Sequence, residues 1–230
     1  MPRFEFMNTL YKLRWLCGCL LFFACSSNTG TGTNPLVITT KDSLAEVQKI
    51  DRAWLQIAEL KKLIRPGDLI VRTGNDFTSE SLRSLNQRNQ DFSHCGIASI
   101  EHDSLFVYHS LGGEWNPDQK IRRDPIEVFA EPYSNRGVGL FRYDITNEDI
   151  TKLLATVWKH YQDGIMFDMK FDLVSDDRMY CAEFVCKSYQ AGTKGKLIFN
   201  ISHIGKFAFY GVDDLFLHPQ CKEIGRIDYK

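Results

Sequence analysis

Cys181 is the residue of this chain best suited to nucleophilic chemistry. A polar loop at residues 176–179 runs into an amphipathic stretch that predicts a helix from about Cys181 to Gly192. A thiol in the first turn of a helix faces unpaired backbone N–H groups and the positive end of the helix dipole. Both favour the thiolate, the form that attacks a carbonyl carbon. The alternative is a small apolar side chain in a core helix.

A cysteine nucleophile needs a base, and the base needs a third group to orient it. Residues 91–100 and 105–109 predict an antiparallel hairpin with a turn at 101–104. This places His94 near the start of one strand and His109 near the end of its partner, so the two imidazoles can be neighbours. Strand alternation sends Cys95 to the opposite face, where we expect it in the core. The alternative for both histidines is an ordinary core position.

Other elements must position this trio. Apolar residues recur at three- and four-residue steps from Leu44 to Leu60, which predicts one long helix with an apolar face. Further predicted elements are a strand at 68–73, a polar helix at 79–89, a helical turn at 126–129, a strand at 137–143 and a helix at 146–161. Segments 197–198, 207–210 and 214–216 predict short strands or turns. We expect the substrate pocket to form from Trp115, residues 167–171 and the C-terminal segment.

Composition excludes several classes of protein. The 230 residues carry a formal net charge of −1 and no basic run, which argues against nucleic-acid binding. No Cys-x-x-Cys pair is present, so neither a zinc ribbon nor a redox motif is supported, and we expect no metal and no cofactor. The four cysteines beyond residue 25 are too scattered to suggest a disulfide framework, and the oligomeric state stays open.

The first 25 residues have the pattern of an export signal. Lys12 and Arg14 precede an apolar segment at 15–24, which is too short to span a bilayer and ends at Cys25. This resembles a bacterial lipoprotein signal, and the resemblance implies that Cys25 is lipidated and that the protein is anchored to a membrane of the cell envelope. Residues 26–42 then form a flexible tether and 43–230 the folded domain. The alternatives are an ordinary secretory signal or a buried apolar helix.

The sequence segments around the histidines and the cysteine resemble motifs of a known family. Pro-Gly-Asp-Leu-Ile at 66–70 and Ser-His-Cys-Gly-Ile at 93–97 are similar to segments of NlpC-like cell-wall peptidases, where the cysteine helix comes first. Here Tyr-Cys-Ala-Glu at 180–183 comes after them. That order resembles the circularly permuted papain-like amidases of the YaeF/YiiX type, and the lecithin retinol acyltransferase group shares it. Cys95 replaces a valine of that pattern, Ala182 a serine, and His109 stands where a glutamate is usual.

The resemblance implies an α+β fold in which a small antiparallel sheet or barrel packs against helices, the nucleophile helix among them. It also implies that Cys181 attacks an amide or ester, that His94 carries the proton and that His109 orients His94. Tyr180 either lines the site or is a buried aromatic anchor. The expected substrate is a small molecule, a peptide or an acylated compound. Two alternatives remain: an acyltransferase, and a papain-like domain that binds peptidoglycan or lipid without turnover.

Overall fold

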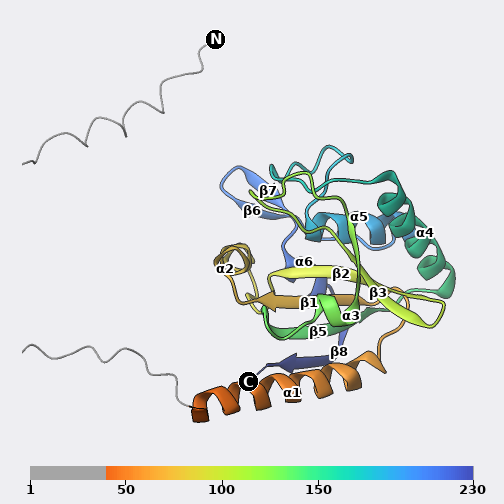
Figure 1. Ribbon diagram of the computed structural model, residues 1–230. Coiled ribbons are helices and arrows are strands. Elements are labelled where there is room, and N and C mark those ends of the chain that lie inside the picture. Colours follow the sequence, from red (N-terminus) through yellow and green to blue (C-terminus); the bar gives the residue numbers. More distant parts are fainter. Residues whose placement is uncertain (1–39, 230) are drawn as a thin grey trace, which may run out of the picture. The chain divides into compact units, whose positions relative to one another are not determined.

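A six-stranded antiparallel sheet forms the centre of the molecule, which the computed structural model describes over residues 40–229 (Figure 1). The strands lie in the order β4-β3-β2-β1-β5-β8. Their bounds are β1 Leu69–Gly74, β2 His94–Glu101, β3 Ser104–His109, β4 Arg122–Pro125, β5 Asn135–Tyr143 and β8 Cys221–Asp228. A separate pair of short strands, β6 Ser202–Ile204 and β7 Phe207–Phe209, forms a hairpin outside this sheet.

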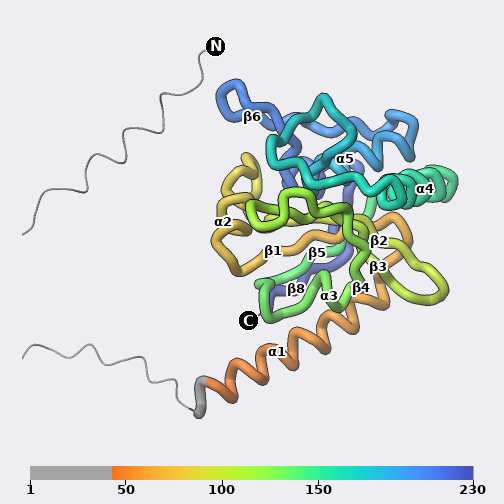
Figure 2. Tube along the Cα trace, turned by 45° about the horizontal axis from the view of Figure 1, so that its top comes forward, coloured from red at the N-terminus to blue at the C-terminus, as the bar shows by residue number. Residues whose placement is uncertain are grey.

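Helices cover both faces of the sheet. On one face lie α1 (Thr40–Lys61) and the short α3 (Ile126–Phe129); on the other lie α4 (Asn147–Asp163), α5 (Cys181–Gly192) and α6 (Val212–Phe216). Figures 1 and 2 show α1 running beneath the sheet while α4 and α5 lie above it. Each face has its own apolar cluster, because alternate residues of the strands point to opposite sides.

The Pro-Gly-Asp-Leu segment acts as a structural corner at the start of β1. Gly67 takes a positive φ of 81°, which favours glycine, and its carbonyl accepts a hydrogen bond from the Tyr189 hydroxyl of α5 at 2.7 Å. The buried Asp68 carboxylate accepts two hydrogen bonds from Arg142, each at 2.7 Å. This corner therefore ties β1 both to its neighbour β5 and to the helix that carries Cys181.

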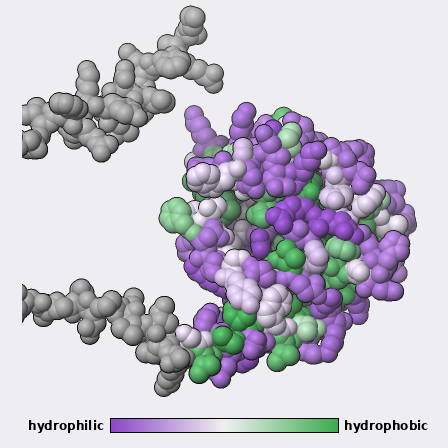
Figure 3. Space-filling view, in the orientation of Figure 1, coloured by the Kyte–Doolittle hydropathy of each residue, from purple (hydrophilic) through white to green (hydrophobic). Residues whose placement is uncertain are grey.

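The long N-terminal helix is confirmed, but its apolar stripe does not pack along its whole length. Ile50, Ile57 and Leu60 are buried against the sheet, whereas Leu44 and Val47 are more than half exposed. In Figure 3 apolar side chains accordingly reach the surface at the lower edge of the view, over α1.

The other predicted elements agree with the structure in part. The hairpin, the strand at 137–143, the helix at 146–161 and the cysteine helix are all present. The helix predicted at 79–89 is α2, which spans Phe77–Ser84. It begins earlier than predicted because Asp76 caps it, its carboxylate accepting the N–H of Ser79, and it ends five residues before the predicted end. Residues 214–216 belong to α6, not to a strand. Strands β4 and β8 were not predicted.

The predicted fold class is confirmed at the level of a mixed α+β domain with an antiparallel sheet packed against helices. The predicted signal at 1–25, with Cys25, and the tether up to residue 39 lie outside the described residues. Within residues 40–229 no helix combines the length and the apolar character needed to cross a membrane.

Candidate active site

The nucleophile candidate is the first residue of α5. Tyr180 is the N-cap in an extended conformation, and the Glu183 carboxylate accepts the Tyr180 backbone N–H at 3.3 Å. This fixes the first turn of the helix, so Cys181 lies where the N–H groups of the helix start are directed. Its side chain is 7% exposed, which leaves it close to the surface of a pocket rather than sealed in the core.

Cys181 differs electrostatically from the other three cysteines of the described part of the chain, all of which are also free thiols. Hydrogen bonding from the Cys95 thiol, together with backbone N–H groups of Ala182 and Cys95, lowers the pKa of Cys181 against the opposing effect of burial. Burial raises the pKa of Cys95 and Cys186 well above the ordinary value, and that of Cys221 to about 12. Of these four thiols, Cys181 is therefore the one held closest to the thiolate.

The two predicted histidines contact each other. His94 is the first residue of β2 and His109 the last of β3, and His94 Nε2 lies 2.8 Å from His109 Nδ1. Gly96 makes this approach possible, because a Cβ there would lie 2.6 Å from Val107 Cγ1 and 3.0 Å from His109 Cβ. The glycine of the Ser-His-Cys-Gly-Ile segment thus has a packing role in positioning the histidine pair.

Sequence reasoning missed the next member of this chain of hydrogen bonds, Asp124 on β4. Its Oδ2 lies 3.0 Å from His109 Nε2 and 2.7 Å from Arg122 Nη2. In the β3–β4 register Arg122 is opposite His109 and Asp124 is opposite Val107, so Asp124 reaches His109 diagonally. No local pattern marks a short charged segment such as residues 122–125 as a strand, and the contact depends on that pairing.

Asp124 determines which ring nitrogens carry protons. The hydrogen bond from His109 and the charge of Arg122 lower the pKa of Asp124, although burial opposes them, so the carboxylate is ionised and can only accept. His109 must then donate from Nε2 and accept at Nδ1. His94 must in turn donate from Nε2, which assigns a lone pair to its Nδ1. The chain of hydrogen bonds therefore ends in a basic nitrogen.

Both imidazoles are held neutral. Burial, followed by the positive charge of Arg72 and neighbouring groups, lowers the pKa of His94 well below its ordinary value. Burial also lowers the pKa of His109 to about 4, although the hydrogen bond to Asp124 acts in the opposite direction. Arg72 itself lies over the Phe129 ring, 4.9 Å from its centroid, and donates to the Phe129 carbonyl at 2.9 Å.

Cys181 lies against the start of β2 but makes no hydrogen bond to the His94 ring among those found for residues 40–229. Its sulfur interacts with the thiol and backbone N–H of Cys95, the residue that follows His94. The His94 ring packs on Phe129 of α3, with ring centroids 5.7 Å apart. The hydrogen bond to His109 leaves His94 Nδ1 without a partner in the described structure.

A second link ties the cysteine to the end of β3. The Ser110 hydroxyl donates to the Met179 carbonyl at 2.6 Å, both groups being buried. Ser110 follows His109 and Met179 precedes Tyr180, so this bond fixes the entry to α5 relative to the histidine pair. The site is therefore held together by two chain segments that are 69 residues apart.

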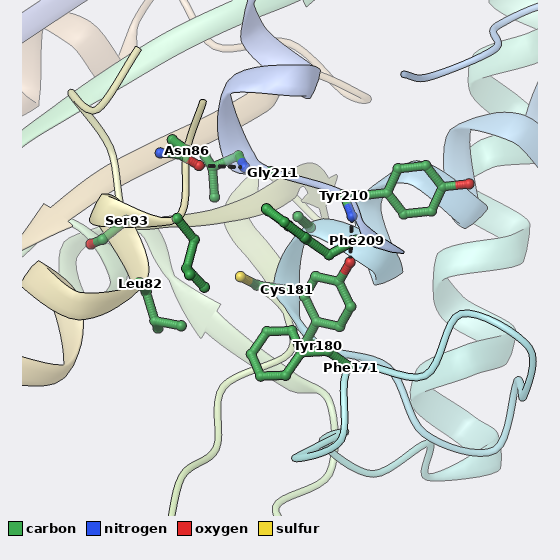
Figure 4. A pocket seen from close by; sticks show the side chains of 12 residues that line it. Leu82, Asn86, Ser93, Phe171, Tyr180, Cys181, Phe209, Tyr210 and Gly211 are labelled. Carbon is green, nitrogen blue, oxygen red and sulfur yellow. Dashed lines mark hydrogen bonds between the residues drawn. The ribbon is translucent and has the colours of Figure 1, made fainter. Parts of the chain in front are cut away.

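A pocket opens beside the cysteine, and Figure 4 shows the Cys181 sulfur among its lining side chains. Tyr180 also lines it, and its hydroxyl accepts the Tyr210 backbone N–H at 2.6 Å, so the residue is both a wall of the pocket and an anchor. Of the predicted lining, Phe171 and residues of the C-terminal part are present. Trp115 is 99% exposed and does not contribute.

Comparison with solved structures identifies the fold. The chain is similar to the crystal structure of the metalloprotein yiiX from Escherichia coli O157:H7 (DUF1105), with a TM-score of 0.58 and 19% identity, over 71% of this chain and 97% of that chain. This chain has the YiiX fold. No protein-family model matches the sequence, and neither does any curated protein. The YiiX likeness supports the family suggested by the sequence motifs at the level of the fold.

The donor atoms of this site do not suit a metal ion. Within residues 40–229, no group of three or more His, Cys, Asp or Glu side chains is arranged to hold one. Three candidate donors, His94 Nε2 and both His109 nitrogens, are already engaged in the hydrogen bonds to His109, His94 and Asp124. The description of yiiX as a metalloprotein therefore has no counterpart in the described side chains, and we derive no chemical step through a metal.

Proposed function

We propose that this protein is a cysteine hydrolase of the circularly permuted papain-like type, which cleaves an amide or ester through a thioester on Cys181. The observation that carries the proposal is the chain Asp124–His109–His94, which ends in the unpaired Nδ1 of a histidine next to the residue that Cys181 contacts. The order of the elements supports the permuted assignment, since β2 and β3 precede the cysteine helix.

In the proposed reaction the Cys181 sulfur attacks the carbonyl carbon while His94 Nδ1 takes up the thiol proton. His94 returns this proton to the leaving amine or alcohol, and water then hydrolyses the thioester with His94 as the base. The Cys181 backbone N–H, at the positive end of α5, contributes to the stabilisation of the oxyanion. His109 and Asp124 act as positioning residues that maintain the tautomer of His94. The step requires the His94 ring to reach the sulfur.

We also propose that the enzyme is anchored to a membrane of the bacterial cell envelope through a lipid on Cys25. The basis is the sequence of residues 1–25 and the polar stretch that follows. Replacement of Cys25 by Ala should release the protein from the membrane fraction. Continued detergent-dependent retention of the Cys25→Ala variant would place the anchor elsewhere.

Alkylation kinetics test the proposed function directly. The complete chain is treated with iodoacetamide at pH 7, and labelling of each cysteine is followed by peptide mass spectrometry. We expect Cys181 to react at least tenfold faster than Cys221, whose thiol is held protonated. The His94→Ala variant should react more slowly at Cys181 than the wild type, because the base that takes up the thiol proton is gone. His203→Ala, which changes an exposed histidine on β6, should react like the wild type.

Product analysis separates the remaining alternatives. Incubation with 4-nitrophenyl acetate should give an acetylated Cys181 peptide that disappears with time in water. Persistence of the adduct until an amine is added would indicate acyl transfer instead of hydrolysis. Equal alkylation rates for Cys181 and Cys221, with no adduct, would leave only a binding role for the domain.

A further inference from the structure

The pocket next to Cys181 has four walls, built from five separate segments of the chain. α2 and the two residues after it provide one of these walls, the segment before β2 a second, and the start of α5 a third; two further segments that lie apart in the sequence, the Phe171 loop and residues 209–212, share the fourth (Figure 4). The side chains that present carbon to the interior are Leu82, Leu85, Phe171, Tyr180, Ala182, Phe209 and Val212. None of the lining residues within the described part of the chain is charged.

The polar groups in the lining are used by the protein itself. The Asn86 side chain donates to the Phe92 carbonyl at 2.8 Å and accepts the Val212 N–H at 3.0 Å. The Ser93 hydroxyl oxygen accepts the Gly74 N–H at 3.2 Å, and the Tyr180 hydroxyl accepts the Tyr210 N–H. A ligand with several polar groups would therefore lose its hydrogen bonds to water without replacing them.

The size of the pocket limits what it can take. The space between its walls that water-sized groups can occupy is about 30 Å³. One water molecule needs about 10–15 Å³ by this measure, so the space corresponds to about two water-sized groups. A methylene group is of similar size, so an acyl chain of about two to four carbons fits between the walls, whereas an octanoyl or palmitoyl chain does not.

We infer that this pocket receives the acyl side of the substrate, and that the enzyme removes short aliphatic acyl groups of about two to four carbons from an amine or alcohol. The inference rests on the proposed hydrolase function. The new carbon–sulfur bond forms between the acyl carbonyl carbon and Cys181, and the bond from that carbon to the leaving nitrogen or oxygen breaks. Water then adds to the thioester, which releases the fatty acid and restores the thiol.

A series of 4-nitrophenyl esters tests the acyl preference of the complete chain reconstituted in lipid nanodiscs. Acetyl, butanoyl, hexanoyl, octanoyl and palmitoyl esters are compared, with Cys181→Ala as the blank for reaction elsewhere. We expect kcat/KM to rise by up to about fourfold for each methylene that is buried between acetyl and butanoyl, and to fall again at octanoyl and palmitoyl.

Substitution of Leu82 locates the preference in the pocket. Leu82 lies on α2 and is only partly buried, so Leu82→Trp can fill the cavity with little effect on the core. The ratio of butanoyl to acetyl kcat/KM should fall at least fivefold. Phe77→Trp is the matched control, because Phe77 lies on the same helix, is 86% exposed and does not line the pocket. That variant should retain the wild-type ratio.

The possible outcomes are distinguishable. Equal turnover of acetyl and butanoyl esters, or an unchanged ratio in Leu82→Trp, would overturn the acyl pocket and leave the hydrolase intact. A chain whose Cys181 forms no adduct with any ester would overturn the proposed function, and this inference with it.

Discussion

His94 Nε2 lies 2.8 Å from His109 Nδ1, and this contact determines what His94 can do. Because His109 donates its single ring proton, on Nε2, to Asp124, it must accept from His94 at Nδ1, and the free nitrogen of His94 is left basic. In a site without Asp124, either tautomer of the pair would satisfy the contact. The carboxylate on β4 thus acts on the proposed base through one intervening imidazole.

Substitutions of His109 test whether it acts on His94 as a hydrogen-bond acceptor. His109→Leu leaves the buried His94 N–H without an acceptor, which costs about 1–3 kcal/mol, so kcat/KM should fall by roughly tenfold to a hundredfold. His109→Gln supplies a carbonyl oxygen and should retain at least a third of the wild-type value. Steady-state ester hydrolysis measures both variants. Identical losses for Leu and Gln would show that His109 does not act as a hydrogen-bond acceptor.

We expect Asp124 to affect kcat/KM because it fixes the tautomer of the histidine pair. Asp124→Asn can still accept from His109 through its amide oxygen, so we expect a loss in kcat/KM of no more than about threefold. Asp124→Leu cannot accept, and about a tenfold loss should follow, with KM changed less than kcat. A ¹⁵N NMR spectrum of the imidazoles reports which ring nitrogen carries the proton. A purely structural role of Asp124 would leave this unchanged. The spectrum should show a change of the protonated nitrogen in Asp124→Leu only.

The low pKa of His94 predicts the acid limb of the rate profile. A histidine whose pKa is lowered stays neutral, and therefore basic, down to a lower pH than a free imidazole. The kcat/KM of ester hydrolysis should thus begin to fall only well below pH 6.5. Arg72→Gln removes one of the charges that hold His94 neutral, so its acid limb should move towards higher pH. A wild-type midpoint at or above 6.5 would contradict the neutral, buried assignment of this ring.

The same burial should make the protein less stable in acid. The pKa of His109 is about 4 in the folded protein and near 6.5 in the unfolded chain, so the unfolded state binds more protons between these values. The free energy of unfolding therefore falls as the pH drops from 6.5 to 4, by about 3 kcal/mol for this group. Burial raises the pKa of Glu183 to about 7, against its ion pair with Lys187, and this works in the opposite direction over the same range.

Because these two groups oppose each other, the comparison of variants is more informative than the wild-type curve. Urea denaturation from pH 4 to 7 should show a smaller loss of stability on acidification in His109→Gln than in the wild type. Glu183→Gln should show a larger loss, since the opposing contribution is removed. Parallel curves for wild type and His109→Gln would mean that His109 titrates normally in the folded protein.

Local sequence patterns predict the part of the site that depends on single elements and on the hairpin. The alternation of residues 91–109 predicts the hairpin, and the hairpin alone brings His94 to His109. The amphipathic run after Tyr180 likewise predicts the cysteine helix. In contrast, Asp124 becomes a partner of His109 only through the pairing of β4 with β3, and residues 122–125 consist of two arginines, an aspartate and a proline. A strand made of such residues has no propensity signal, so its position follows from tertiary pairing.

The pocket was likewise only partly accessible from the sequence. Aromatic residues in loops suggested its walls, and Phe171 agrees with that expectation. Trp115 does not, because an exposed aromatic side chain and a lining one cannot be told apart without the path of the loop. Leu82 lies in the short polar helix α2 and Leu85 is its C-cap, and their role as lining becomes apparent only in the folded structure.

Substitution of Gly96 tests whether the close packing of β2 against β3 positions the histidine pair. In Gly96→Ala the added Cβ would lie 2.6 Å from Val107 Cγ1 and 2.7 Å from the Tyr108 carbonyl oxygen, so β2 and β3 must move apart. Such overpacking costs about 1–3 kcal/mol of stability, and the displaced His109 should lower kcat/KM by at least tenfold. Gly113→Ala is the matched control, because its Cβ would meet only the Asn116 side chain, at 3.9 Å. Urea denaturation and ester hydrolysis measured on both variants would contradict this account if Gly96→Ala retained wild-type stability and activity.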